Sequence, residues 1–363
     1  MDDLLRRPFL TCLTLTALAA GGCATARPDA AGESLEGNAR QLTRGFAEAS
    51  DAVFSPDMRW IAFRARPADE EGAQLYLAPL RSERGEITGI GQPIRVTPPG
   101  TRNASPTFSA DGRTLLFSST AASQTDPLEV GSAEPGRFDP KADLFRVDGW
   151  QRNLAAADPR VGVNFARHPL APHPGYDGQP AFTPDGRHVI FASDRAAPES
   201  ALDTRSLVDL WAMRSDGTGL VRLTDWQGYD GAPAVTPDGR NVVFQSEHEH
   251  TGRFHIYIAP LSHDDAGNIT GIGRPRRLTD QGSNTAPAIA PNAARLVYVR
   301  VPLDEANAAQ LRQVRPDGRR DRAVTRQGDQ DAASVSPDGR YLLFSAPAED
   351  GTRQIHLMPY RPG

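Results

Sequence analysis

A short phrase built on a turn recurs six times along the 363-residue chain and constrains the fold more than any other feature. Its typical form is an apolar residue followed by Ser or Thr, Pro, Asp, Gly and Arg, and successive copies begin 54, 74, 53, 54 and 46 residues apart. A period near 50 residues indicates a repeat architecture, in which each unit buries its apolar face against its neighbours. The copies are Phe54–Arg59, Phe108–Arg113, Phe182–Arg187, Val235–Arg240, Ile289–Ala294 and Val335–Arg340.

The phrase predicts a β-hairpin. Proline presets the backbone of a turn, aspartate can bond backbone amides, and glycine tolerates positive φ. Apolar residues flank the phrase on both sides, so it joins two antiparallel strands. Met58 and Ala293 stand where glycine is usual. We expect those two turns to be looser or of another type, because a side chain resists positive φ.

Three further strands follow each turn in a common pattern. The second strand carries an aromatic residue at one position, the third is marked by apolar pairs such as Leu75-Tyr76, and the fourth ends in Leu or Val plus Thr, with Leu154-Ala155 as a degraded copy. Four strands in each of six units, without convincing helical periodicity, predict an all-β fold, a six-bladed β-propeller of four-stranded antiparallel blades. The aromatic positions are Phe63, Phe117, Phe191, Phe244, Tyr298 and Phe344.

The two ends of the repeat region predict how the ring closes. The sixth unit stops at Met358–Tyr360, after its third strand, and a matching fourth strand appears ahead of the first turn as Arg40–Thr43. We expect this N-terminal strand to complete the last blade, because the pairing removes two exposed sheet edges. The propeller would then span residues 38–363.

The first residues predict export and lipid anchoring. The apolar stretch Phe9–Ala20 is too short to cross a bilayer, and the small residues before Cys23 resemble a bacterial lipoprotein cleavage site. We expect residues 1–23 to be a signal peptide, Cys23 to be lipidated and hold the protein at the membrane, and residues 24–37 to be a flexible tether. Arg6-Arg7 resembles a twin-arginine signal, and an ordinary secretion signal stays open. By resemblance to proteobacterial sorting, Ala24 favours the outer membrane, which places the protein in the periplasm.

Composition excludes some partners. A net charge of −5 gives no reason to expect a nucleic-acid partner, because nucleic acid is bound by basic surfaces. Cys12 lies in the predicted signal peptide, so the mature protein would keep only Cys23 and form no internal disulfide. We expect a monomer.

One propeller face is predicted to be more elaborate than the other. The Pro-Asp-Gly turns lie on one face, which we call the turn face. The opposite face, the loop face, carries long segments at 119–142, 156–179 and 194–208. Long loops tolerate variation and concentrate binding residues, so we expect a partner to bind there on the side of blades 2 and 3. The alternative is that these long loops arose by neutral insertion and have no binding role.

On the loop face, a polar residue recurs three positions before the proline, or its equivalent, that opens each inner strand. We expect these residues to ring the channel mouth and to hold a divalent cation such as Ca²⁺, or the amine and guanidinium groups of a peptide. The alternative is that each caps its own loop. The predicted channel-mouth residues are Asn103, Asp177, Asp230, Asn284 and Asp331, with Tyr176, Tyr229 and Trp226 nearby.

Histidines cluster in one segment of the fourth unit. His248, His250 and His255 are weak candidates for metal ligands, with a solvated hairpin tip as the alternative. We find no Gly-x-Ser-x-Gly elbow, no phosphate loop and no His-Glu-x-x-His motif.

The repeat, with its apolar-aromatic strand and its closing Leu-Thr, resembles that of TolB-type propellers over residues 38–363. The same repeat occurs in the propeller half of prolyl-oligopeptidase-like enzymes. The resemblance implies a periplasmic binding protein that presents one propeller face to protein partners. TolB has an additional α/β domain and no lipid anchor, and these differences weaken the transfer. No hydrolase domain follows the sixth unit, which argues against peptidase activity.

These observations lead us to expect a non-catalytic, lipid-anchored scaffold of the bacterial envelope that binds a protein or peptide partner. The alternative is a metal-dependent enzyme or carbohydrate-binding protein that uses the central channel. A surface assembly module with no small ligand is a third possibility.

Overall fold

The computed structural model describes residues 39–121, 141–154, 167–198, 201, 207–249, 252–303, 308–326 and 328–361. This part of the chain contains 26 β-strands and one short α-helix, α1 (Trp150–Leu154). The predicted all-β class is confirmed.

The strands group into units that follow the sequence repeat, and we number these units as blades 1 to 6. Pairing within each unit is antiparallel, and a parallel contact between Glu48 and Arg353 joins blades 1 and 6 into one nine-stranded sheet. Blades 1 to 3 contain β2 (Phe46–Phe54), β3 (Trp60–Pro67), β4 (Gln74–Glu83), β5 (Glu86–Ile90) and β6 (Ile94–Arg95); β7 (Asn103–Phe108), β8 (Thr114–Ser119), β9 (Asp143–Asp148) and β10 (His168–Pro169); and β11 (Asp177–Phe182), β12 (His188–Ser193), β13 (Asp209–Arg214) and β14 (Val221–Arg222).

Blades 4 to 6 complete the set. They contain β15 (Asp230–Val235), β16 (Asn241–Ser246), β17 (His255–His263), β18 (Ile269–Ile272) and β19 (Arg276–Arg277); β20 (Ser283–Ile289), β21 (Leu296–Val301), β22 (Gln310–Val314) and β23 (Arg322–Ala323); and β24 (Asp331–Val335), β25 (Tyr341–Pro347), β26 (Arg353–Pro359) and β1 (Arg40–Gln41).

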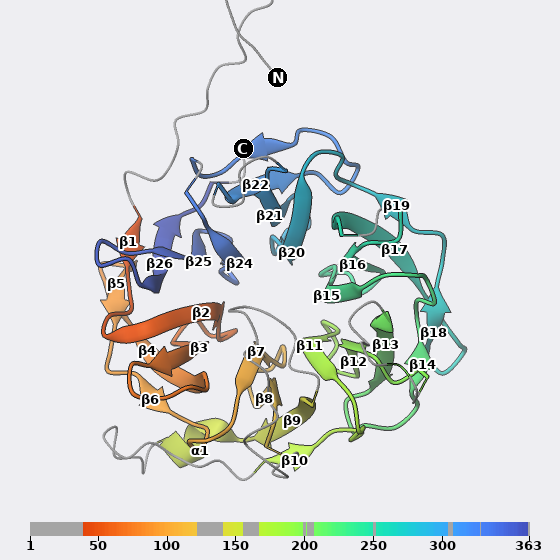
Figure 1. The fold of residues 1–363 in the computed structure, drawn as a ribbon, viewed down its shortest axis with the longest axis horizontal. Helices are drawn as coiled ribbons and strands as arrows, with labels where there is room; N and C mark the ends of the chain where they lie inside the picture. Colours follow the sequence, from red (N-terminus) through yellow and green to blue (C-terminus); the bar gives the residue numbers. More distant parts are fainter. Residues whose placement is uncertain are drawn as a thin grey trace, which may run out of the picture. The chain divides into compact units, whose positions relative to one another are not determined.

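The innermost strands form a closed ring. Each of β2, β7, β11, β15, β20 and β24 contacts the next, and β24 contacts β2. Figure 1 shows these strands around a common axis, with the second and later strands of each blade lying progressively outward.

The N-terminal strand completes the last blade, as predicted. Arg40 and Gln41 of β1 pair antiparallel with Leu357 and His356 of β26. The pairing continues beyond the strand, because the Leu42 N–H donates to the Ile355 carbonyl at 2.7 Å. The Ile355 N–H in turn donates to the Thr43 hydroxyl at 2.9 Å. The outer edge of β26 is therefore covered by the start of the described chain.

The repeated phrase forms the predicted turn. In blade 3 the Thr183 hydroxyl donates to the Asp185 carboxylate at 2.6 Å, and the same oxygen accepts the Arg187 N–H at 3.0 Å. Gly186 has a φ of 70°, the left-handed conformation that favours glycine. The aspartate therefore closes the hairpin between β11 and β12.

The expectation of looser turns at Met58 and Ala293 is wrong. Both residues adopt a φ of 54°. Their N–H groups reach Ser55 and Ala290 carbonyls at 2.9 and 2.8 Å, as the glycine of the other copies does. A left-handed conformation costs a side-chain-bearing residue roughly 1–2 kcal/mol. The paired strands on both sides of each turn hold Met58 and Ala293 in this conformation despite that cost.

The predicted position of the fourth strand of blade 2 is also wrong. Leu154, predicted to mark it, is the last residue of α1, and Ala155 lies outside the described residues. The strand that pairs with β9 is β10, where His168 and Pro169 face Arg146 and Phe145. The insertion of α1 between β9 and β10 displaced the pattern.

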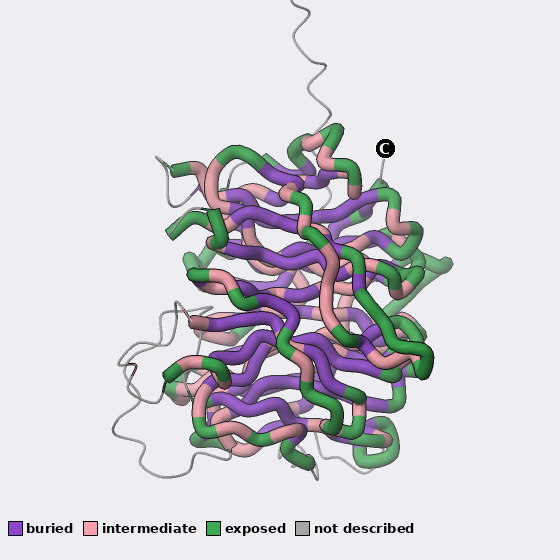
Figure 2. Tube along the Cα trace, turned by 90° about the vertical axis from the view of Figure 1, so that its right-hand side faces the viewer, coloured by how far each residue is buried: buried purple, intermediate pink, exposed green. Residues whose placement is uncertain are grey.

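The core lies between the blades. Figure 2 shows buried strand segments stacked through the ring, with exposed residues at the turns. The recurrent aromatic residues of the second strands pack there as predicted, because all six are at most 4% exposed. Truncating such a residue to alanine typically costs about 3–5 kcal/mol.

Candidate functional site

The predicted channel-mouth residues all lie where inner strands begin, on the loop face. Asn103, Asp177 and Asp230 open β7, β11 and β15, and Asn284 is the second residue of β20. These four side chains are at most 3% exposed. They therefore lie between blades rather than at an open surface.

Each of these residues joins its blade to the one before. Its backbone N–H donates to a carbonyl at the start of the third strand of the preceding blade, a bond that links neighbouring blades. The bonds, of 2.7–3.2 Å, run from Asn103 to Ala73, Asp177 to Ala142, Asp230 to Val208, Asn284 to Phe254 and Gln330 to Ala309.

In blade 6 this position belongs to Gln330, so the assignment of Asp331 is wrong. Asp331 faces Ser345 across the strand pair, as Gly178 faces Ala192 in blade 3. The proline that lies three residues after this position in β7, β11, β15 and β20 is replaced here by Ala333, which shifted the count by one residue. The Asp331 side chain instead accepts the N–H of Ala332 at 2.8 Å.

Side chains complete these blade junctions. Between blades 1 and 2, the Gln74 side-chain oxygen accepts hydrogen bonds from the Asn103 amide at 3.2 Å and the Thr97 hydroxyl at 2.9 Å. Gln74 opens the third strand of its blade, as Asp209 does in blade 3 and His255 in blade 4. The sequence interpretation overlooked Gln74 and Asp209. Aligning the repeat copies on their strand registers identifies both.

The junction between blades 3 and 4 brings two carboxyl groups together. Asp209 and Asp230 are 2% and 1% exposed. Burial raises the pKa of Asp209 to about 6, although Arg222 lies 2.7 Å from its carboxylate. Burial and the nearby Asp209 raise the pKa of Asp230 to about 7. Near neutral pH this pair therefore retains part of its protons.

The two Tyr-Asp-Gly segments owe their glycines to close packing. A Cβ on Gly178 would collide with the Tyr176 ring, and one on Gly231 would collide with the Tyr229 ring. Tyr176 is buried, whereas Tyr229 is partly exposed and donates its hydroxyl to Gln179 at 2.8 Å. The motif thus fixes one tyrosine at each of two successive junctions.

Aromatic side chains reach the loop face of blade 4. The ring of the exposed His248 lies 4.4 Å from that of the partly exposed Trp226. Tyr229 meets Phe254, also partly exposed, edge to face at 5.8 Å. We call Trp226, Tyr229, His248 and Phe254 the aromatic surface. Phe254 was not predicted.

The histidines do not form a metal centre in the described part of the chain. His248 is exposed and His255 is buried in the junction between blades 4 and 5, whereas His250 lies outside the described residues. Across the described ranges, no three His, Cys, Asp or Glu side chains gather to hold a metal ion.

Other predicted features fall largely outside the described residues. These are Cys23, the signal peptide, the tether and most of the loops at 119–142, 156–179 and 194–208. None of the helices that the structure describes has the length and apolar character needed to cross a bilayer.

Comparison with known proteins supports the fold. An uncharacterized protein of Agrobacterium fabrum is 28% identical over 130 residues, a match that covers 35% of this chain and 40% of that protein. Three solved structures are similar at 15–18% identity, which shows the fold alone. A protein described as TolB from Agrobacterium tumefaciens has a TM-score of 0.53, with 86% of this chain and 90% of that chain covered.

The other two structures are TolB from Acinetobacter baumannii and an oligogalacturonate lyase in complex with manganese. Both have a TM-score of 0.51 and cover 89% of this chain, with 66% and 91% of their own chains covered. The model of the TolB beta propeller domain matches residues 164–360, which is more than half of the 363 residues. The chain therefore belongs to the TolB β-propeller domain family.

Proposed function

We propose that the protein is a non-catalytic scaffold of the bacterial envelope that binds a protein or peptide partner on its loop face. Membership of the TolB β-propeller family supports a protein-binding scaffold. In this proposal a lipid on Cys23 anchors the protein in the periplasm, at the outer membrane, through the tether of residues 24–37.

The aromatic surface carries the proposal. Trp226, Tyr229 and Phe254 are partly exposed and His248 is exposed, all on the face where inner strands begin. Trp and Tyr are enriched among the residues that dominate binding energy at protein interfaces, because they bury a large area with few rotatable bonds. The turn face differs, because the charged residues Asp111 and Arg113 of its blade 2 turn are 59% and 83% exposed.

The buried junctions hold this surface in place. The Glu247 carboxylate accepts the Tyr229 N–H at 3.2 Å, and Gln179 of the preceding blade accepts the Tyr229 hydroxyl. Trp226 is stacked at 5.9 Å on Phe244, which is fully buried. The aromatic groups are thus preorganised, which reduces the entropy lost on binding.

Pull-down from detergent extracts of the envelope tests the proposal. We expect Trp226→Ala in the full chain to reduce recovery of the partner at least tenfold, because interface tryptophans commonly contribute about 2 kcal/mol or more. Arg240→Ala on the turn face is the matched control and should leave recovery unchanged. Equal recovery with both variants would contradict the proposal.

The anchor is tested separately. Cys23→Ser should remove the lipid, detected by mass spectrometry, and release the protein from the membrane fraction. Retention of this variant in the membrane fraction would exclude the proposed anchor. For the alternative of a metal-dependent enzyme, metal analysis of the purified protein is the direct test.

A further inference from the structure

Two of the blade junctions are built from the same parts. Blades 1 and 4 carry an extra hairpin strand, β5 and β18, in matching register: Leu80 faces Ile90 in blade 1, and Leu261 faces Ile272 in blade 4. Each hairpin lies against the preceding blade, so the junction of blades 6 and 1 can be compared with that of blades 3 and 4 residue by residue. We call the junction of blades 6 and 1 the closed junction and the junction of blades 3 and 4 the open junction.

The closed junction is filled by its own side chains. The Tyr341 hydroxyl donates to the Glu86 carboxylate and accepts the Ile87 N–H at 3.4 Å. Arg340 forms an ion pair with the same carboxylate. Arg40 of β1 donates to the Thr88 carbonyl. A buried phenol and an exposed carboxylate therefore meet in this junction.

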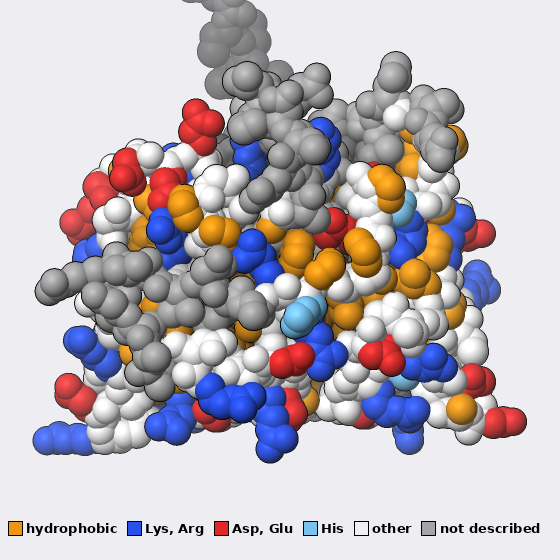
Figure 3. Space-filling model, turned by 90° about the horizontal axis from the view of Figure 1, so that it is seen from below, with side chains coloured by type: hydrophobic (Ala, Val, Ile, Leu, Met, Phe, Trp, Pro, Cys, Tyr) orange, Lys and Arg blue, Asp and Glu red, His pale blue; other side chains and the backbone are white. Residues whose placement is uncertain are grey.

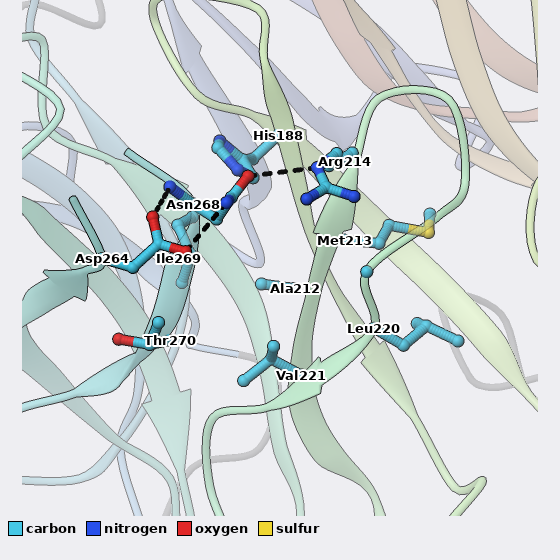
Figure 4. A pocket seen from close by; sticks show the side chains of 11 residues that line it. His188, Ala212, Met213, Arg214, Leu220, Val221, Asp264, Asn268, Ile269 and Thr270 are labelled. Carbon is cyan, nitrogen blue, oxygen red and sulfur yellow. Dashed lines mark hydrogen bonds between the residues drawn. The ribbon is translucent and has the colours of Figure 1, made fainter. Parts of the chain in front are cut away.

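The open junction has smaller or neutral residues at the equivalent positions. The strand registers place His188 where Tyr341 stands, Ala212 for Leu357, Val221 for Arg40 and Asn268 for Glu86. A groove of about 220 Å³ lies there, between β13 and β14 on one side and the β18 hairpin on the other (Figure 4). The groove thus occupies the place that the closed junction fills.

One polar group of this groove lacks a partner. His188 lines the groove and is 4% exposed, and its Nε2 has no hydrogen-bond partner among the described residues. Burial lowers the pKa of His188, and although Asp185 raises it, the nearby Arg187, His263 and Arg214 lower it further, so the ring is neutral at neutral pH. A neutral imidazole nitrogen forms one further hydrogen bond, either as donor or as acceptor.

Two guanidinium groups, of Arg187 and Arg214, lie at the rim of the groove, which the Asp264 carboxylate also lines. The guanidinium of Arg187 donates to the Ala266 carbonyl at 3.0 Å, whereas its equivalent Arg340 pairs with Glu86. Arg214 donates to Asn268 at 3.1 Å and to Thr218 at 3.3 Å, with the Asn268 contact drawn in Figure 4. In the described part of the chain both guanidinium groups hydrogen-bond only neutral acceptors. The groove therefore lacks the carboxylate that its counterpart contains.

Nearby carboxylates are engaged in their own turns. The Asp264 carboxylate accepts hydrogen bonds from the N–H groups of Ala266 and Asn268 and from the Asn268 side chain. An oxygen of Asp216 accepts from the N–H and the hydroxyl of Thr218. Neither replaces Glu86.

We propose that the open junction binds a tyrosine side chain that stands next to an acidic residue in a protein partner. The phenol enters the groove and bonds to His188, and the carboxylate meets Arg187 and Arg214, as Tyr341 and Glu86 meet in the closed junction. Leu220, 41% exposed beside the groove, offers apolar contact to the rest of the segment. This site lies on the outer rim at the turn-face end of the strands, away from the loop face of the proposed function.

Titration of the full chain with the peptide acetyl-Tyr-Glu-amide tests the site, with the His188 ring signals followed by NMR. We expect saturable binding that shifts these signals. Acetyl-Phe-Glu-amide should bind about 3- to 10-fold more weakly, because one hydrogen bond is lost. Acetyl-Tyr-Gln-amide should also bind more weakly, and its binding should lose most of its salt dependence. No shift with the first peptide, or equal binding of all three, would overturn the proposal.

Two variants locate the site. His188→Tyr copies the closed junction into the groove and should reduce peptide binding more than tenfold, with a melting temperature equal to or above that of the wild type. The matched double variant Tyr341→His/Glu86→Asn opens the closed junction and should bind a second equivalent. If the double variant does not fold, His188→Tyr alone decides: wild-type affinity in that variant contradicts the site.

Discussion

Asp177 and Asp230 occupy the same position in adjacent blades, yet their surroundings differ. Both follow a tyrosine, precede a glycine and donate a backbone N–H to the preceding blade. Asp177 forms an ion pair with Arg195 at 2.6 Å, and the guanidinium lies over the Phe191 ring at 5.1 Å. Asp230 has no cation against it in the described part of the chain. The buried carboxyl group is therefore paired with a cation of its own blade in blade 3 and has no such cation among the described residues of blade 4.

The difference arises two residues after the end of the second strand. His248 stands in blade 4 where Arg195 stands in blade 3, and Trp226 covers Phe244 as the guanidinium covers Phe191. The histidine therefore lies on the surface beside Trp226 instead of reaching the buried carboxyl. The same backbone thus supports a structural ion pair in one blade and an aromatic surface in the next.

The largest expected effect comes from breaking the ion pair. Arg195→Ala leaves the fully buried Asp177 carboxylate without its cation, which typically costs about 3–5 kcal/mol. His248→Ala is the matched change in blade 4 and should cost about 1 kcal/mol or less, because it removes only a stacking contact. The free energy of unfolding from urea titration distinguishes the two. Equal losses would contradict the comparison.

The pH dependence of stability should differ in size at the two positions, because burial raises the pKa of both carboxyl groups, and Arg195 opposes the rise at Asp177 whereas no cation of the described residues opposes it at Asp230. The folded-state pKa of Asp230 is raised from 3.8 to about 7, so the folded protein binds more protons than the unfolded chain between these values. Its contribution to stability is present at low pH and is lost as the pH rises from about 4 to 7. For an isolated group the loss would approach about 4 kcal/mol, and sharing with Asp209 reduces it.

Asp230→Asn tests this effect. The variant should lose less stability than the wild type over that pH range, and its free energy of unfolding at pH 8 should equal or exceed that of the wild type. Asp177→Asn should instead be destabilised at pH 8, because Arg195 loses its partner. Parallel pH profiles for the wild type and Asp230→Asn would rule out a buried titrating carboxyl at this position.

Much of the fold could be predicted from the sequence because each hairpin repeats its own turn chemistry. Prediction failed where a copy departs from the repeat: Ala333 replaces the opening proline of blade 6, and α1 interrupts the end of blade 2. Strand pairing also imposed positive φ on Met58 and Ala293, against their intrinsic preference.

The site was less predictable because the role of each residue depends on partners distant in the sequence. Asn103 and Asp177 look like ligands in the sequence, yet each contacts a partner 29 or 18 residues away that buries it. One overlooked signal was present. The segment Ile-Thr-Gly-Ile-Gly occurs at 87–91 and again at 269–273, and it marks the two hairpins whose junctions differ at Tyr341 and His188.

The most direct measurement of the central claim is site-specific photocrosslinking in intact cells. A benzophenone amino acid at position 248 lies in the aromatic surface, and one at position 240 lies in a turn on the opposite face. Figure 3 shows charged side chains along the lower edge of the molecule in that view. We predict a discrete envelope-protein adduct from position 248 and none from position 240. An adduct from position 240 alone would contradict this prediction.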